Sequence, residues 1–240
     1  TTILDTGPGA AAAAIDSNKA DLAVIRHDTG MPKDGQVVAI LRKNVVVFIV
    51  PSPSEPERAS APETNDTSKA KAAKAAKGGT TKTTKPVAQK SNSINKFEDL
   101  IGKRLGVIGR SPTNIELLKV ILRQQNIDTG NLAILTAADM EKPNEAGKIS
   151  IVQFDPNNVS SAIRESNVDA IMSVGPVSSP ITADAIAAAT RNKVAPTFLK
   201  IDASEAIAER NPIFESAEIK AGSFGGSPQR PEEAVETDRK

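Results

Sequence analysis

Apolar residues in the first fifty positions fall into short runs separated by turn residues. Residues 21–25 (DLAVI), 36–41 (QVVAIL) and 44–50 (NVVVFIV) are rich in β-branched side chains, which predicts three strands. Residues 10–15, which follow a turn signal at residues 6–9, predict a short alanine-rich helix.

The clearest pattern covers residues 97–128. Residues 104–109 (RLGVIG) form an apolar run bounded by glycine, which is typical of a buried strand in a parallel sheet. Ser111 and Pro112 follow, and serine as N-cap with proline at the first helical position predicts that a helix starts here. The next apolar residues recur at helical spacing: Ile115, Leu118 and Leu122. The helix start therefore follows the carboxyl end of the strand, where open α/β sheets bind ligands and free backbone N–H groups favour an anion.

Strand-type runs then alternate with short helical stretches. The predicted strands are residues 132–135, 149–154, 168–174, 196–201 and 217–220. The predicted helices are residues 159–166, 182–190 and 204–211. This alternation indicates an α/β fold around a parallel sheet.

Residues 51–93 interrupt this pattern. They contain almost no bulky apolar side chain and are dense in Pro, Ser, Thr, Ala and Lys, so they cannot bury enough surface to offset the entropy of ordering. We expect a disordered, dispensable insertion. Its basic block, residues 69–85, is either a solvated linker or a site for an acidic surface or anionic lipid.

Composition removes several functional classes. The chain has 30 basic and 29 acidic residues, so no overall charge directs it to nucleic acid. It has no cysteine and a single histidine, His27, which excludes disulfides, thiolate metal sites and a metal site built on a histidine pair. No nucleophile–base pair or phosphate-binding motif is recognisable, so we expect neither an enzyme nor a cofactor. No apolar run approaches the roughly 20 residues of a membrane span, and the chain begins without a signal-peptide pattern, so a signal was removed or the chain is an excised piece.

The sequence EDLIGKRLGVIG, a polar turn and LLKVILRQQNID resemble the start of the second lobe in type II periplasmic solute-binding proteins, especially the TAXI-family receptors of TRAP transporters. The resemblance runs from about Thr6 to Thr237, apart from the insertion. It implies a two-lobed α/β fold, with residues 1–50 and 195–240 in the first lobe and residues 94–194 in the second. The family's first strand and its glycine-rich ligand loop would precede Thr1, and its C-terminal region would follow Lys240, so the first lobe is expected to be incomplete.

The resemblance also implies a function. A small, anionic organic solute, such as a carboxylate or amino acid, would be captured between the lobes and passed to membrane transporter subunits. The expected location is the periplasm, either free or tethered through a segment outside this chain. A ligand-sensing regulatory module and a receptor of an ABC transporter are the alternatives on the same fold.

The loop of residues 109–114 is the best site candidate. Ser111, Thr113 and Asn114 can donate hydrogen bonds to a carboxylate, and Arg110 adds a guanidinium. The structural alternative is a well-capped helix with an exposed arginine.

The resemblance places Arg26, His27 and Asp28 in the cleft from the first lobe, directly after the predicted strand of residues 21–25. Arg26 can hold a carboxylate with two hydrogen bonds. A histidine such as His27 is more often a surface hydrogen-bonding group than a ligand contact.

The resemblance further assigns ligand contacts to Ser173 and Gly175, at the end of the predicted strand of residues 168–174. A plain strand-ending turn is the alternative. Phe224 stands where the family usually has tyrosine, which leaves an apolar contact and removes a hydroxyl.

Overall fold

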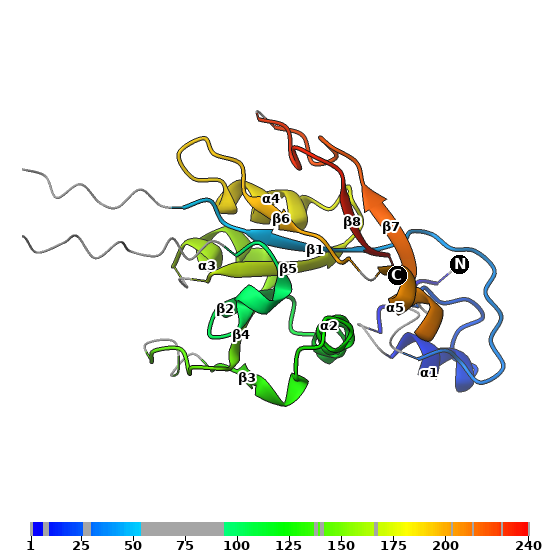
Figure 1. Ribbon diagram of the computed structural model, residues 1–240. Coiled ribbons are helices and arrows are strands. Elements are labelled where there is room, and N and C mark those ends of the chain that lie inside the picture. The colour runs from blue at the N-terminus through cyan, green and yellow to red at the C-terminus, as the bar shows by residue number, and fades with distance from the viewer. Residues whose placement is uncertain are drawn as a thin grey trace, which may run out of the picture.

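The computed structural model describes residues 2–6, 10–25, 30–53, 94–136, 139, 142–165, 168–202, 204–212, 214–226 and 228–239. Within these ranges, eight strands form one sheet in the order β3-β4-β2-β5-β1-β8-β7, and β6 pairs with β1 (Figure 1). The strands are β1 (Val45–Val50), β2 (Arg104–Ile108), β3 (Leu132–Ile134), β4 (Ile149–Phe154), β5 (Ala170–Gly175), β6 (Thr197–Leu199), β7 (Glu215–Ile219) and β8 (Val235–Arg239). The helices are α1 (Ala11–Asp16), α2 (Pro112–Gln124), α3 (Val159–Glu165), α4 (Pro180–Ala189) and α5 (Ser204–Arg210), with 3-10 turns at Phe97–Leu100, Thr129–Asn131 and Pro156–Asn158.

The sheet is mixed. Strands β3, β4, β2 and β5 run parallel, as the alternation of strands and helices predicts. β1 runs antiparallel to β5, with Val45 opposite Gly175, and it also pairs antiparallel with β6 and β8. The hairpin of β7 and β8 completes the sheet. The fold is thus the mixed α/β type expected of a type II periplasmic-binding protein.

Helices cover both faces of the sheet, which explains why β1, β2, β4 and β5 read as continuous apolar runs. Val46 and Phe48 point into a core shared with α2 and α5, whereas Val45, Val47 and Ile49 point into a second core shared with α3 and α4. In Figure 1, α4 lies above β1 and β5, and α2 lies below these two strands. Burial on both faces makes β1 one of the best-packed elements of the described chain.

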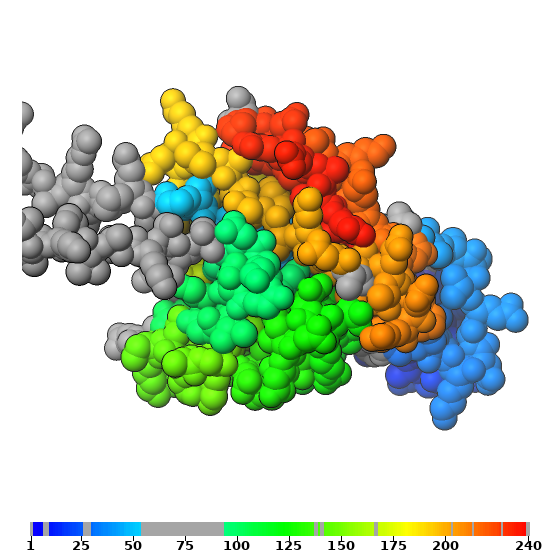
Figure 2. All heavy atoms as spheres, in the orientation of Figure 1, coloured from blue at the N-terminus to red at the C-terminus, as the bar shows by residue number. Residues whose placement is uncertain are grey.

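Two predicted strands near the N-terminus are wrong. Residues 21–25 and 36–41 are irregular in the structure, and their large apolar side chains, such as Leu22 and Val38, are exposed. Neither segment has a neighbouring strand within the described residues, and an extended segment becomes a strand only when its backbone finds hydrogen-bond partners. Figure 2 shows the N-terminal residues as a blue projection at the right end of the molecule.

Two further differences concern boundaries and the C-terminus. Residues 51–53 belong to the fold and not to the insertion, because the Ser52 hydroxyl is buried and donates to the Val194 carbonyl at 2.6 Å. The rest of the predicted insertion, residues 54–93, lies outside the described residues. β8 was not predicted. Strands from residues 1–50, 94–194 and 195–240 share one sheet, and the division into two lobes stays a prediction.

Candidate functional site

The carboxyl ends of the parallel strands define the candidate site. Because β2, β4 and β5 are parallel neighbours, the loops that follow them lie along one edge of the sheet. β1 is antiparallel to β5 and therefore begins at this same edge, where Val45 is opposite Gly175. We call this the carboxyl edge. Because β2 and β5 are parallel neighbours, the loop of residues 109–114 and the loop after β5 leave the sheet at this same edge.

The loop after β2 leaves the strand through Gly109, whose φ of +90° is in the region that favours glycine. α2 then begins at Pro112, as predicted, but the Ser111 hydroxyl does not cap it. That hydroxyl instead forms a short hydrogen bond with the Thr113 hydroxyl. Arg110 is exposed and has no hydrogen-bond or ion-pair partner in the described part of the chain. Pro112 has no N–H, and the Asn114 N–H donates to the Ser111 carbonyl at 3.1 Å, so the start of α2 offers an anion the Thr113 N–H and the Arg110 guanidinium.

Asn114 has a structural role. Its side chain is buried, and its Nδ2 donates a hydrogen bond to the Ile108 carbonyl at 3.0 Å. This bond fixes the angle between the end of β2 and the start of α2. It also turns one of the amide's donors away from the loop surface, so a ligand contact from Asn114 stays a prediction.

Ser173, on β5, is buried as well. Its hydroxyl is 2.8 Å from the Thr182 hydroxyl on α4, so the pair ties strand to helix. α4 begins two residues before the predicted start and is capped by Ser179, which accepts from the Thr182 N–H. A Cβ on Gly175 would lie 3.4 Å from Ser179 Cβ, so the strand and the following turn approach closely there. These contacts favour a structural role for Ser173 and Gly175.

Phe224 is half-buried and packs against the core. Its ring stacks on Phe198 of β6, with centroids 5.9 Å apart and an interplanar angle of 5°. The pair lies against the core on the α4 side of the sheet. The remaining predicted contacts, Arg26, His27 and Asp28, lie outside the described residues and stay predictions.

An open depression of about 680 Å³ lies next to the carboxyl edge. Its walls come from the loop after β5, the start of β1, strand β7 and the turn that follows β7. The lining residues are Lys43, Val45, Val177, Ser178, Ser216, Ala217, Glu218 and Ser223. The Lys43 ammonium is 2.6 Å from a Glu215 carboxylate oxygen, which fixes one side of the depression. Its volume falls within the roughly 300–1,000 Å³ typical of small-molecule sites.

Sequence reasoning missed the residues of this depression. Lys43, Ser178 and Ser216 lie on three different elements and form no motif. The sequence offered one indication of this depression, Ser178, which lies in the loop after the predicted strand of residues 168–174.

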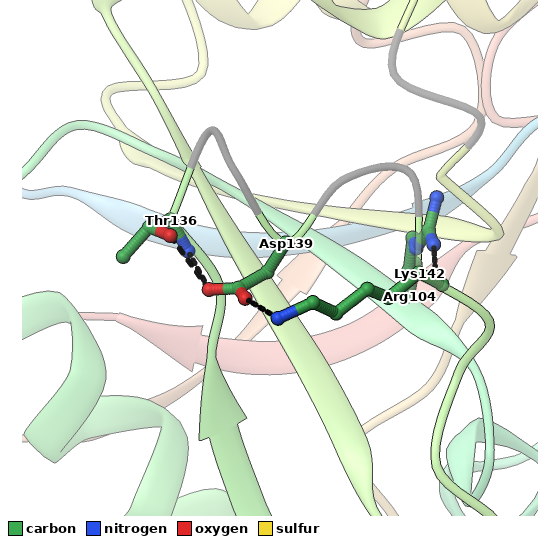
Figure 3. A network of polar contacts seen from close by, with 4 residues as sticks. All are labelled: Arg104, Thr136, Asp139 and Lys142. Carbon is green, nitrogen blue, oxygen red and sulfur yellow. Dashed lines mark hydrogen bonds and ion pairs between the residues drawn. The ribbon is translucent and has the colours of Figure 1, made fainter.

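A separate polar network stabilises the connection between β3 and β4 (Figure 3). Asp139 accepts hydrogen bonds from the Lys142 ammonium at 2.7 Å and from the Thr136 hydroxyl at 2.6 Å. These bonds, the one from Lys142 first, hold the pKa of Asp139 well below its usual value. Arg104 joins the network by donating to the Lys142 carbonyl and to Asn144 Oδ1. Lys142 and Asp139 form an ion pair, and the Arg104 guanidinium is hydrogen-bonded to neutral oxygens, so this network is structural.

Asp238, on β8, is the most unusual titratable group. Its side chain is fully buried, and neither carboxylate oxygen has a hydrogen-bond partner among the residues that the structure describes. Burial, and secondly the charge of nearby Glu236, raise the pKa of Asp238 to about 7. Asp238 is opposite Ser216 in the β7–β8 pairing, but it does not line the depression.

Two kinds of feature are not found in the part of the chain that the structure describes. There is no group of three or more His, Cys, Asp or Glu side chains that could hold a metal ion. No described helix combines the length and the apolar composition that crossing a membrane requires.

Comparison with known proteins identifies the family. Residues 73–195, which are 123 of the 240 residues, match the family described as NMT1/THI5 like. No curated protein matches the chain. The matched residues include β2, β4, β5 and the loops of the carboxyl edge. The family has a periplasmic solute-binding fold, is generally non-enzymatic and typically extracytoplasmic, and commonly provides the substrate-binding domain of transporters. This chain belongs to the NMT1/THI5-like family.

Proposed function

We propose that the chain is the solute receptor of a TRAP-type transporter, and that it binds a small organic anion at the carboxyl edge. The observation that carries the proposal is the start of α2. There an exposed, unpaired Arg110 adjoins a helix start whose backbone donors have no side-chain cap. A positive group beside the Thr113 N–H at a helix start favours a carboxylate over a neutral solute.

Solute capture fits the groups that the described part of the site supplies. The described residues at the edge supply hydroxyls, a guanidinium and backbone N–H groups, which bind and orient an anion. Ser111 and Thr113 share one hydrogen bond, so either hydroxyl can rotate to a ligand oxygen at the cost of that bond. No described histidine or cysteine lies near them, and a base that could activate a hydroxyl is not among their hydrogen-bond partners.

Closure is the second part of the proposal. Arg26, from the predicted first lobe, would bind the same anion from the opposite side, so that one ligand holds both lobes only when the cleft is closed. Losing such a charge-assisted contact in a desolvated cleft costs about 2–5 kcal/mol. Arg26→Ala should therefore weaken binding by tens-fold or more, and small-angle scattering should show less compaction on ligand addition.

A thermal-shift screen of the full chain against carboxylates and amino acids tests the proposal. A ligand present at about 100 times its Kd stabilises the native state by about 2.7 kcal/mol, which is a clear rise in Tm. Rises confined to anionic compounds would support the proposal. Rises for neutral solutes, equal to those for anions, would contradict it.

The transporter class needs a separate measurement. Uptake of the identified solute into membrane vesicles can be followed with the receptor added from outside. Uptake that does not depend on ATP hydrolysis supports the TRAP-type partner, whereas uptake that requires ATP hydrolysis indicates an ABC transporter. Absence of any receptor-dependent uptake would favour the regulatory alternative.

A further inference from the structure

The segment of residues 36–41 has the composition of a buried strand but lies exposed. Its four large apolar side chains are 63%, 80%, 70% and 73% exposed at Val37, Val38, Ile40 and Leu41. The similar run that follows it, β1, is almost completely buried. An apolar run of this kind on the surface marks an interaction site.

The backbone of this segment is also unpaired. From Gln36 to Arg42, no residue makes a hydrogen bond within the described part of the chain. The C-terminal end of the segment is held, because Lys43 is ion-paired with Glu215 of β7. The N–H and C=O groups of the segment are therefore available to another strand.

The charges beside the apolar run indicate which strand fits. Asp34 precedes the run and Arg42 follows it. Both side chains are exposed, and neither has an ion-pair partner among the described residues. When a second copy of the segment runs antiparallel, Asp34 of each strand lies beside Arg42 of the other strand, so that an opposite-charge pair forms at each end of the paired segments. A parallel, in-register copy would place like charges together, which is unfavourable.

We propose that residues 34–42 pair antiparallel with the same residues of a second copy of this chain, around a two-fold axis at Val38. In a two-fold antiparallel pair, residues opposite each other lie on the same face of the two-stranded ribbon. Side chains alternate between faces along a strand, so the residue numbers of two opposite residues must both be even or both be odd. With Val38 on the axis, Val37 is opposite the partner's Ala39, and Asp34 is opposite the partner's Arg42. Shifting either strand by two residues loses both charge pairs, which defines this register.

Sedimentation velocity of the full chain over a range of concentrations tests the dimer. The unmodified chain should form a dimer. Val38→Lys should raise the dimer Kd by at least about tenfold, because it places two ammonium groups together at the axis. Val194→Lys is the matched control, since Val194 is also an exposed valine, at 53%, but lies far from this segment in the sequence. It should leave the Kd unchanged.

A charge exchange tests the register. Arg42→Asp alone should weaken the dimer because it faces each Asp34 with another carboxylate. The double variant Asp34→Arg with Arg42→Asp should restore it. A monomer at every concentration, or equal effects of Val38→Lys and Val194→Lys, would overturn the proposed pairing. Failure of the double variant to restore the dimer would overturn the proposed register.

Discussion

Replacing Asp238 by asparagine should make the protein more stable at neutral and alkaline pH. Asparagine has nearly the same shape as protonated aspartic acid but cannot ionise. In the native protein the buried Asp238 has a pKa of about 7, whereas an unfolded chain would titrate it near 3.8. The Asp238 carboxyl therefore ionises readily in the unfolded chain, whereas its ionisation in the native protein costs free energy.

The sign of the pH dependence follows from this difference. Below about pH 4 the carboxyl is protonated in both states and Asp238 has no effect on stability. Between about pH 4 and pH 7 only the unfolded chain loses the proton, so the free energy of unfolding falls as pH rises. Above about pH 7 the carboxyl is ionised in both states, and its effect on the free energy of unfolding no longer changes with pH. A shift of roughly three pKa units corresponds to about 4 kcal/mol, and local opening of β8 that lets water reach the carboxylate would reduce it.

Urea unfolding at pH 5 and pH 8 measures the effect. The unmodified protein should lose stability between these two values relative to Asp238→Asn, whose own curve should change less with pH. The variant should exceed the unmodified protein at pH 8 by a few kcal/mol, up to the value above. Glu236→Gln is a useful companion, because removing the nearby charge should shift the same transition to lower pH by a smaller amount. Identical pH dependence in the unmodified protein and Asp238→Asn would refute the reasoning.

Four further substitutions test the packing around the site, each by urea unfolding. Gly106→Ala should destabilise by about 1–3 kcal/mol, because its Cβ would lie 2.5 Å from the Phe154 ring, whereas Gly175→Ala, with its nearest contact at 3.4 Å, should cost less. Equal losses would contradict this. Leu118→Ala should cost about 2–5 kcal/mol, since the side chain is fully buried between α2 and the sheet, and a loss below 1 kcal/mol would show that the α2 packing is misplaced. Asn114→Ala should cost about 1–3 kcal/mol by leaving the Ile108 carbonyl without its partner, and no loss would contradict the assigned bond.

The central elements could be predicted from the sequence because their signals are local. β2, α2, β4 and β5 lie close to where apolar runs, turn residues and the Ser111-Pro112 pair predict them. Strand formation by residues 36–41 could not be decided in the same way. Those residues have as strong a strand composition as β1, yet only β1 has neighbouring strands to pair with. β8 is the opposite case, a strand without a strand-like sequence. Its sequence VETDR is largely polar, and it forms a strand because it pairs with β7 and β1, which lie elsewhere in the sequence.

The sequence predicts a ligand loop after β2, and the structure places that loop at the carboxyl edge. Ligand binding by the loop stays a prediction. Whether a polar side chain faces the ligand or the core depends on burial, which sequence does not reveal. Asn114 and Ser173 both turned out to be buried and hydrogen-bonded within the fold. Lys43 and Ser178 approach each other only because β1 and β5 are neighbours.

Calorimetric titration of the best anionic ligand into Arg110→Ala and Arg123→Ala tests the central claim most directly. Both arginines are exposed on or next to α2, but Arg110 precedes its start and Arg123 lies in its last turn. We predict that Arg110→Ala weakens binding by about 1.5–3 kcal/mol, the value of a hydrogen bond to a charged group, and that Arg123→Ala leaves the Kd unchanged. An unchanged Kd for Arg110→Ala, or equal losses for both variants, would contradict binding of the anion at the carboxyl edge.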